Sequence, residues 1–396
     1  MRRIQNNNHK GIFFIIPYRF LIIMLLLFII TSSAIFTVSY STFQHSLRST
    51  FIYQALSNYK SQSLFYLMNT ENHHLSKAFD KDFSPPSLSS IALQLATNIR
   101  IADARSLFGS ELPGFLIFDS NILLAGKGTD YTNIPHESSP SLESISGERE
   151  LAPQESQKYE ESQKQEKSNQ QAEKSTGDKK VVYIYHTHSW ESFLPLIGLQ
   201  GDKDADKAVD NKTNITLVGK MLGMELKADG IGAEVDTTNM TQELNEKRWK
   251  PYRAYDMSRT VVETALQQNK DVQYLIDIHR DSRRAKDTTT TINGKSYAKI
   301  MIVLGEANPH FDQNFKLAKE LHQSLEKKYP GLSRGVLSKR KTSGNNGLYN
   351  QDLSNNSILI EVGGVDNNME ELSNTVKAFS DVFSENYWKA EKVNAQ

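Results

Sequence analysis

A long apolar stretch lies close to the start of the chain. It runs from Phe20 to Val38 without a charge, and as a helix rising about 1.5 Å per residue it would be roughly 28 Å long. A bilayer core is about 30 Å thick. Four basic residues, and no acidic one, precede it: Arg2, Arg3, Lys10 and Arg19. The pattern predicts a cytoplasmic segment at 1–19, a transmembrane signal anchor at 20–38 and later domains outside the membrane. A cleaved signal peptide is the alternative, although its apolar region is usually shorter.

Residues 41–135 combine a helical pattern with two strand patterns. The segment 46–69 repeats apolar residues such as Phe51, Ala55 and Tyr59 at helical spacing. The segment 114–126, GFLIFDSNILLAG, predicts two short strands around an Asp-Ser-Asn turn. Neither segment carries a chemical motif. We therefore expect a small membrane-proximal α+β region that packs or binds a partner.

The composition changes over residues 136–180. Ser, Glu, Gln and Lys dominate this segment, and large apolar residues are few. Such a segment cannot bury enough apolar surface to offset the entropy of ordering. It is therefore predicted to be a flexible linker. The alternative is a solvated helix in the half rich in Gln, Glu and Lys.

Strand and helix patterns alternate from residue 181 to residue 396. Apolar runs typical of strands occur at 181–188, 232–238, 272–280, 297–305 and 356–364. Helical periodicity occurs at 214–230, 253–269, 311–329 and 369–392, and Gly230 is placed to cap the first of these helices. This alternation predicts an α/β fold with a doubly wound sheet and flanking helices.

Composition narrows the possible chemistry. The chain has no cysteine, which excludes disulfides and cysteinate metal sites, so any metal must be held by His, Asp or Glu. Lys plus Arg and Asp plus Glu both number 46. This balance gives no indication of a nucleic-acid partner, and we expect none.

Three ionisable residues follow three of the predicted strands. His188 lies just past VVYIY. His279 directly follows YLIDI, and Glu361 directly follows SILI. Ligands of open α/β sheets bind outside the carboxyl ends of the strands, so these residues would converge if the strands are neighbours. Each also has a purely structural alternative. The histidines can be ordinary hydrogen-bonded residues, Glu361 can pair with a lysine, and His188 with Glu191 can be an exposed pair on a turn.

The stretch YHTHSWES, residues 185–192, contains a possible metal motif. A catalytic zinc takes three His or carboxylate ligands and keeps a position for water, and His188, Glu191 and His279 meet this requirement. His188 and Glu191 are three residues apart, which lets both side chains point the same way on a turn. His186 would share a face with His188 in an extended strand, so either histidine is a candidate ligand. We favour His188, and His186 would then support the ligands or face the substrate.

These motifs together resemble the stage II sporulation protein P family. The resemblance is carried by the basic N-terminus, the single anchor, the spacer, and then IYHTHSWESF, LIDIHRDS and ILIEVGG in that order. That family consists of spore-former enzymes that degrade peptidoglycan during engulfment. It is similar in turn to zinc-dependent N-acetylmuramoyl-L-alanine amidases. The resemblance covers the C-terminal domain closely and the first 135 residues hardly at all.

The amidase similarity implies a role for each residue. His188 and His279 stand where those enzymes have ligand histidines, and Glu361, before Gly363 and Gly364, stands where they have the catalytic acid/base. One departure is the third ligand, because the amidases supply a glutamate at the start of their first helix. The corresponding NKTNITLVG has no acid, and Glu191 is the nearest substitute. Arg280 would bind a carboxylate or steady the oxyanion, or else be a surface charge.

The resemblance implies metal-assisted amide hydrolysis with Zn²⁺ as cofactor. The bond cut would join muramic acid to the L-Ala of the stem peptide, and a second, endopeptidase activity on cross-links is also implied. The partners implied are peptidoglycan stem peptides and the stage II sporulation proteins D and M, at the sporulation septum. The alternatives from other classes are a non-catalytic module that binds peptidoglycan or a partner, and a zinc peptidase that acts on protein.

Overall fold

The computed structural model describes residues 120–137, 140, 143–166, 174–342 and 345–394. The predicted cytoplasmic segment, the span at 20–38 and the helix at 46–69 lie outside these ranges. The chain divides into two units, and all described residues belong to the second, Phe108–Gln396. Within the described ranges, every helix is too short or too polar to span a bilayer.

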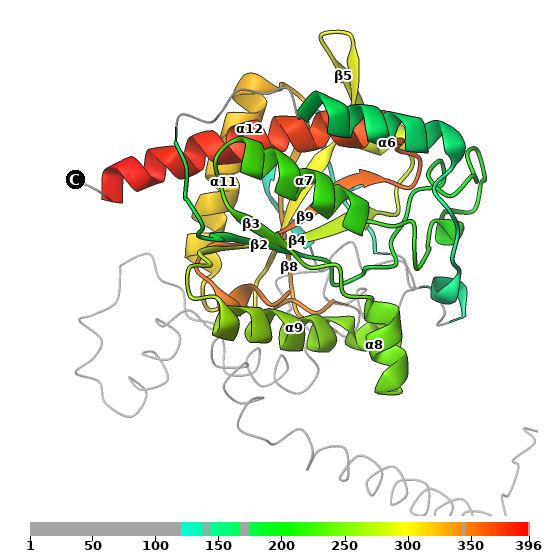
Figure 1. Ribbon diagram of the computed structural model, residues 1–396, viewed down its shortest axis with the longest axis horizontal. Coiled ribbons are helices and arrows are strands. Elements are labelled where there is room, and N and C mark those ends of the chain that lie inside the picture. The colour runs from blue at the N-terminus through cyan, green and yellow to red at the C-terminus, as the bar shows by residue number, and fades with distance from the viewer. Residues whose placement is uncertain (1–119, 138–139, 141–142, 167–173, 343–344, 395–396) are drawn as a thin grey trace, which may run out of the picture. The chain divides into compact units, whose positions relative to one another are not determined.

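A seven-stranded sheet forms the centre of the fold (Figure 1). Its strand order is β1-β8-β7-β9-β4-β2-β3. In that order the strands are Ser120–Ala125, Ser333–Lys339, Ile300–Gly305, Ser357–Gly364, Tyr274–Asp281, Val182–Tyr185 and Ala233–Val235. Strands β9, β4, β2 and β3 are parallel, whereas β7 is antiparallel to β9 and β1 is antiparallel to β8. The α/β prediction is therefore confirmed, but the sheet is mixed.

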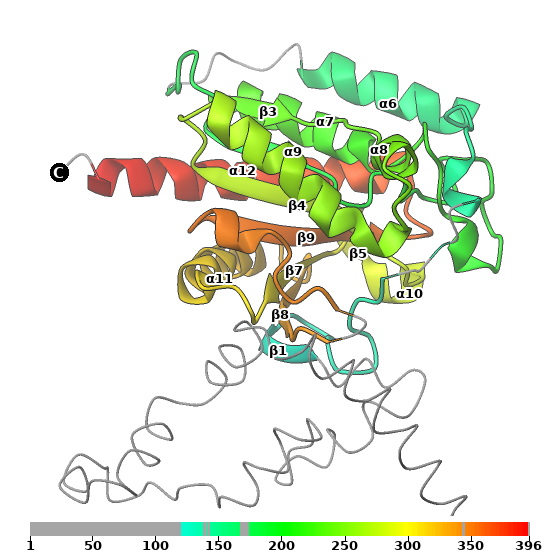
Figure 2. The same ribbon diagram turned by 90° about the horizontal axis from the view of Figure 1, so that it is seen from below.

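Helices cover both faces of the sheet (Figure 2). The larger core lies under α7 (Thr216–Ala228), α11 (Phe311–Lys328) and α12 (Met369–Asn394). The opposite face is covered by α9 (Ala254–Gln268), and α8 (Met240–Glu246) packs against α9. Because strand residues alternate between faces, the sequence position of a residue decides which helical layer it meets.

The linker prediction for 136–180 is wrong for part of that segment. A short 3₁₀ helix, η3 (Ser144–Ser146), and a full α-helix, α6 (Pro153–Glu166), form there. Helix α6 packs against α12 and α7, and the Glu155 carboxylate accepts a hydrogen bond of 2.6 Å from the Met369 N–H at the start of α12. The segment has too few apolar residues for a core of its own, but it packs on the core formed by the later residues.

Strand β1 also belongs to this domain rather than to a separate membrane-proximal region. Ser120 and Asn121, predicted in a turn, are the first residues of the strand and pair with Lys339 and Ser338 of β8. The preceding half of the predicted hairpin lies outside the described residues. The folded domain therefore begins well before residue 181.

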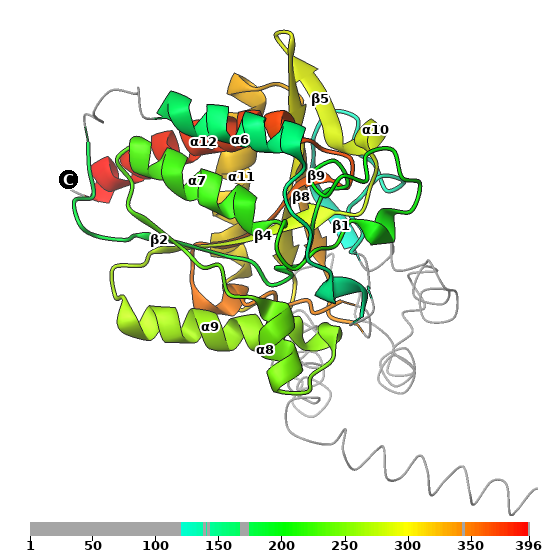
Figure 3. The same cartoon turned by 45° about the vertical axis from the view of Figure 1, so that its right-hand side comes forward.

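The remaining elements are short. They are η4 (Ala205–Lys207), η5 (Pro251–Arg253), α10 (Ala285–Thr288), β5 (Thr289–Ile292), β6 (Lys295–Ala298) and η6 (Gln351–Leu353). Strands β5 and β6 form a hairpin that projects from the body of the domain (Figure 3). Asn293 and Gly294 both have positive φ, 50° and 79°, which is the geometry of a type I′ turn.

Candidate metal centre

The three strands that carry the predicted site residues are neighbours. Strands β2, β4 and β9 lie side by side and run parallel. His279 of β4 is the direct cross-strand partner of Glu361 of β9, so both side chains lie on the face of the sheet covered by α9. The expected convergence at one edge of the sheet is therefore confirmed.

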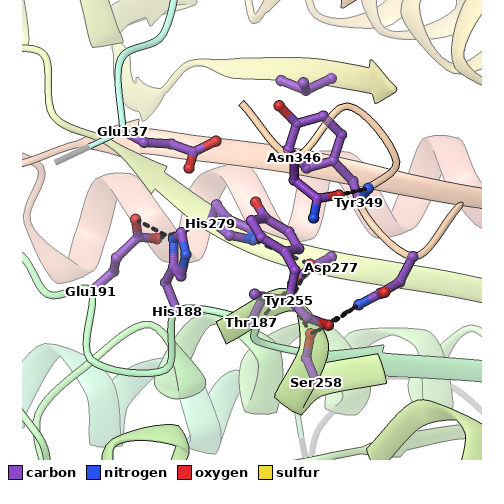
Figure 4. A network of polar contacts seen from close by, with 12 residues as sticks. Glu137, Thr187, His188, Glu191, Tyr255, Ser258, Asp277, His279, Asn346 and Tyr349 are labelled. Atoms are coloured by element: carbon purple, nitrogen blue, oxygen red, sulfur yellow. Dashed lines mark hydrogen bonds and ion pairs between the residues drawn. The ribbon is translucent and has the colours of Figure 1, made fainter. Parts of the chain in front are cut away.

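A turn after β2 places His188 and Glu191 together. The strand ends at Tyr185, and the chain then turns, with the Glu191 N–H donating to the His188 carbonyl at 2.9 Å. One carboxylate oxygen of Glu191 lies 3.6 Å from Nδ1 of His188, and the other lies 3.5 Å from Nδ1 of His279. Glu191 thus bridges the two histidines (Figure 4).

The three side chains fit the needs of a metal ion. One ligand atom from each of His188, Glu191 and His279 lies within 4.8 Å of the others, and all three residues are buried. Among the described residues, Nδ1 of His279 has no hydrogen-bond partner, although a buried polar atom normally has one. Two imidazoles and a carboxylate are a ligand set found at catalytic zinc sites.

Electrostatics also favour a cation at this position. Burial opposes the charge on Glu191, but His279 and the hydrogen bond from His188 outweigh it and lower the pKa of Glu191. Burial likewise opposes a charge on His279, but Asp277 and Glu191 raise the pKa of His279 to about 10. The carboxylates around His279 therefore favour positive charge at this position, which is the charge that a metal ion would supply.

Asp277 supports the site and was not predicted from the sequence. It precedes His279 by two residues in β4, so both side chains lie on the same face of the strand. Its carboxylate accepts hydrogen bonds from the Thr187 N–H at 2.9 Å and the Thr187 hydroxyl at 2.6 Å. One of its oxygens lies 3.2 Å from Nε2 of His279. The sequence Asp-Ile-His could have predicted this contact, because residues two apart in a strand point to the same face.

Glu361 lies beside the three candidate ligands without belonging to their group. It is 2 % exposed, and its Oε2 has no hydrogen-bond partner in the part of the chain that the structure describes. Burial raises the pKa of Glu361, and although His279 opposes this shift, the nearby Glu191 carboxylate adds to it. A carboxyl group with a raised pKa and an unused oxygen, next to a candidate metal site, can take up and release a proton.

The structure corrects the expectation for His186. Because β2 ends at Tyr185, His186 and His188 do not share a face. His186 instead lies against Gly219 of α7, on the opposite side of the sheet, and its Nδ1 is 3.0 Å from the Asp236 carbonyl oxygen. It belongs to the packing between β2 and α7 and does not face the substrate side of the site.

The structure also corrects the expectation for Arg280. Its side chain is 1 % exposed, and its guanidinium donates hydrogen bonds to the carbonyl oxygens of Ala208 and Asp281. It is therefore turned away from any substrate carboxylate or oxyanion. Its backbone N–H, however, donates to Glu191 Oε2 at 2.9 Å and so helps to orient that carboxylate.

Comparison with known sequences decides the family. The sequence profile described as "Stage II sporulation protein P (SpoIIP)" matches residues 102–384. The Stage II sporulation protein P of Bacillus subtilis (strain 168) is 52% identical over 330 residues, which is 83% of this chain and 81% of that protein. The chain belongs to the stage II sporulation protein P family. The resemblance inferred from the three motifs is thereby confirmed.

Two solved structures show a weaker similarity. An N-acetylmuramoyl-L-alanine amidase from Clostridium difficile 630 matches with a TM-score of 0.31 and 14% identity, over 55% of this chain and 98% of that one. A metallo-carboxypeptidase from Burkholderia cenocepacia matches with a TM-score of 0.29 and 13% identity, over 54% of this chain and 59% of that one. Similarity at this level assigns neither the fold nor the activity of this member of the sporulation protein P family.

Aromatic residues and one acid surround the site in this family member. Tyr255 of α9 stacks on His279 with ring centroids 6.1 Å apart, and Trp190 stacks on His188 at 5.0 Å. Glu137 reaches over the same region from the segment that follows β1 (Figure 4). None of these three residues was predicted as part of the site. Glu137 and Tyr255 come from segments without a recognisable motif, and Trp190 lies within YHTHSWES but is not a metal-ligating residue type.

Proposed function

We propose that this chain is a zinc-dependent peptidoglycan hydrolase, an N-acetylmuramoyl-L-alanine amidase that acts in sporulation. The observation that carries the proposal is the convergence of His188, Glu191 and His279, with Glu361 on the neighbouring strand. Membership of the sporulation protein P family supports the biological setting. The intact set of ionisable residues argues against a purely binding module.

The proposed reaction assigns each group a separate task. His188, Glu191 and His279 would hold the ion, which supplies a Lewis acid for the scissile carbonyl and a water of lowered pKa. Glu361 Oε2, which no described residue hydrogen-bonds, accepts the proton of the attacking water and returns it to the leaving amine. The positive charge of an ion beside Glu361 would offset the effect of burial and keep the carboxylate ionised at neutral pH. Trp190 and Tyr255 shield the histidines from bulk water.

Digestion of purified peptidoglycan tests this proposal. The full chain should release stem peptides with a free N-terminal Ala, identified by mass spectrometry, and a chelator should abolish the release. Glu361→Gln keeps the size of the side chain and removes the proton acceptor, so the rate should fall by a factor of roughly 10² to 10⁴ with zinc retained. Products cut only within cross-links would instead indicate the endopeptidase activity. Cleavage of casein but not of peptidoglycan would indicate a protein peptidase and overturn the proposal.

The proposed location and partners follow from the same assignment. Peptidoglycan is extracytoplasmic, which agrees with the anchor predicted at 20–38 and with the domain lying outside the membrane. The stage II sporulation proteins D and M remain the proposed partners at the septum. A phosphatase reporter fused to the C-terminus should be active in cells, and an inactive reporter would contradict the proposed topology.

A further inference from the structure

Lys339 is a buried cation on the face of the sheet that carries the candidate site. The residue is 4 % exposed and ends strand β8. Its ammonium group lies 3.3 Å from Glu137 Oε1, and among the described residues Glu137 is the one acid paired with it. A lysine ammonium has three donors, and a buried charge is costly unless it is paired. Lys339 is therefore suited to bind an anion, and in this structure its ion-pair partner is the Glu137 carboxylate.

Glu137 is less firmly buried than its partner. The Glu137 side chain is 25 % exposed. The segment before it is docked through backbone groups, since the Ser282 N–H donates to the His136 carbonyl at 3.2 Å and the Arg283 Nε donates to the Ile134 carbonyl at 2.9 Å. The position of the Glu137 carboxylate therefore depends on its ion pair with Lys339 and on electrostatic attraction to His188 and His279. A competing carboxylate could replace it without unfolding the domain.

Two tyrosine hydroxyls lie in the same neighbourhood without hydrogen-bond partners. The hydroxyl groups of Tyr255 and Tyr349 are buried and have no partner among the described residues. Their rings meet edge to face with centroids 5.2 Å apart, and Figure 4 shows both hydroxyls turned toward the side where Glu137 lies. Unpartnered buried hydroxyls are rare and indicate an absent hydrogen-bonding partner. The Tyr349 hydroxyl is close enough to Lys339 to interact with it electrostatically, so it is a donor beside a cation.

The backbone of Tyr349 adopts an unfavourable conformation that its hydrogen bonds hold in place. Its φ of 53° and that of Asn350, 55°, are in the left-handed region, which is unfavourable for residues other than glycine. The Tyr349 N–H donates to the Asn346 side-chain oxygen at 2.6 Å. The side-chain amide of Asn350 donates to the Ser258 hydroxyl at 2.9 Å. Backbone strain of this kind persists where the surroundings enforce it, and it occurs often at ligand sites.

We propose that Lys339, with the Tyr349 hydroxyl, forms a subsite for a carboxylate of the substrate, and that Glu137 occupies this subsite in the free protein. The proposal rests on the proposed function, because the ligand it requires is an acidic peptide attached to the scissile bond. An incoming carboxylate replaces the Glu137 carboxylate beside the Lys339 ammonium group. It also accepts a hydrogen bond from the Tyr349 hydroxyl. Glu137 is then a competitor built into the chain.

A pair of soluble acetylmuramoyl peptides, identical except for a carboxylate or a carboxamide on the acidic residue, tests the subsite. Binding is measured by calorimetry on the full chain carrying Glu361→Gln, so that neither probe is consumed. The carboxylate probe should bind roughly 10-fold or more tightly than the carboxamide, because hydrogen bonds between charged groups are the strong ones. Lys339→Met should remove this preference, and Lys339→Arg should retain most of it.

Two further variants sharpen the test. Tyr349→Phe removes an unpartnered hydroxyl, so it should lower the affinity for the carboxylate probe without loss of thermal stability. Glu137→Gln should raise that affinity several-fold. An unchanged preference in Lys339→Met or in Tyr349→Phe would overturn the subsite. A Glu137→Gln variant, with Glu361 intact, that loses cleavage at unchanged KM would show that Glu137 is catalytic instead.

The two levels of proposal fail separately. If the chain with Glu361 intact cleaves neither probe, but the carboxylate preference depends on Lys339 in the binding measurement, the proposed hydrolase is wrong and the subsite stands. If both probes are cleaved equally and bind equally in every variant, the hydrolase stands and the subsite is wrong.

Discussion

Asp277 and His279 touch on the side of the imidazole ring that faces away from Glu191. The Asp277 oxygen lies 3.2 Å from Nε2 of His279, while Nδ1 of the same ring lies 3.5 Å from Glu191. A histidine that binds metal through one nitrogen commonly has its other nitrogen fixed by a carboxylate. Asp277 is itself fixed by two hydrogen bonds from Thr187, which follows β2. The neighbouring strand thus sets the ring orientation of the candidate ligand.

Asp277→Asn should therefore weaken metal binding without removing a ligand. Loss of such a partner typically reduces metal affinity about 10- to 100-fold. Zinc affinity should be measured by competition with a chromogenic chelator, and ring geometry by the visible spectrum of the cobalt-substituted protein. Asp236→Asn, which alters a carboxylate that accepts hydrogen bonds from Thr238 and not from a candidate ligand, is the matched control and should leave both readouts unchanged. Parent affinity in Asp277→Asn would show that Asp277 is only structural.

The choice between the two histidines of YHTH can be tested by zinc content. His188→Ala, Glu191→Ala and His279→Ala should each reduce bound zinc well below one per chain, because each removes a ligand from a set of three. His186→Gln should keep its zinc, since His186 lies against α7. Metal analysis after gel filtration gives the answer. Zinc lost from His186→Gln but kept by His188→Ala would reverse the assignment.

The domain boundary predicts the behaviour of truncated chains. A fragment of residues 180–396 loses β1, so the edge of β8 is exposed, and it loses α6 from the surface of α12. It should melt at a lower temperature than a fragment of residues 108–396 and should aggregate more readily. A third fragment, 143–396, keeps α6 but not β1, and it should fall between the two in circular-dichroism melting. Equal melting of all three would contradict the role of these segments.

His322 predicts a pH dependence of stability that is independent of the site. This residue of α11 is buried, and its Nδ1 lies 2.7 Å from the Ser333 hydroxyl. Burial lowers the pKa of His322 below its ordinary 6.5, although Glu326 opposes the shift. The unfolded chain then binds the proton more tightly, so stability falls as the pH drops below about 6.5 and levels off below the lowered pKa. The melting temperature of the parent should fall more between pH 7.5 and pH 5 than that of His322→Gln. Parallel curves would refute this.

The apolar runs could be read from the sequence, but their pairing partners could not. Strands β2, β4 and β9 are continuous apolar runs, and their ionisable ends predicted where the site would lie. Strand β8, SRGVLSK, was missed because its sequence is polar, yet all seven of its residues are buried. Its Arg334 pairs with Asp281 at 2.6 Å and its Lys339 with Glu137, partners that are distant in the chain. A pattern within one segment cannot show such compensation.

The errors at His186 and Arg280 have a similar origin. Extending β2 by three residues put His186 and His188 on one face, whereas the chain turns after Tyr185. Arg280 was expected to reach a ligand because it follows His279, but neighbours along a strand point to opposite faces. Strand β7, which runs antiparallel to β9, follows the β5–β6 hairpin, whose short strands carry no strong apolar signal.

The pairing of β1 with β8 has a consequence for the order in which the domain is completed. The contacts that dock the β1 segment join residues about 200 positions apart, as in Glu137 with Lys339 and Asn133 with Arg334. During synthesis, the part of the domain made first must wait until β8 has been added before it can dock. Pairings this distant in the chain form slowly, because the chain loses the entropy of a long loop before the new contacts can stabilise it. Until β8 is added, the acid that will pair with Lys339 has already been made but has no partner, so a segment that leaves the ribosome early is among the last to be fixed in place.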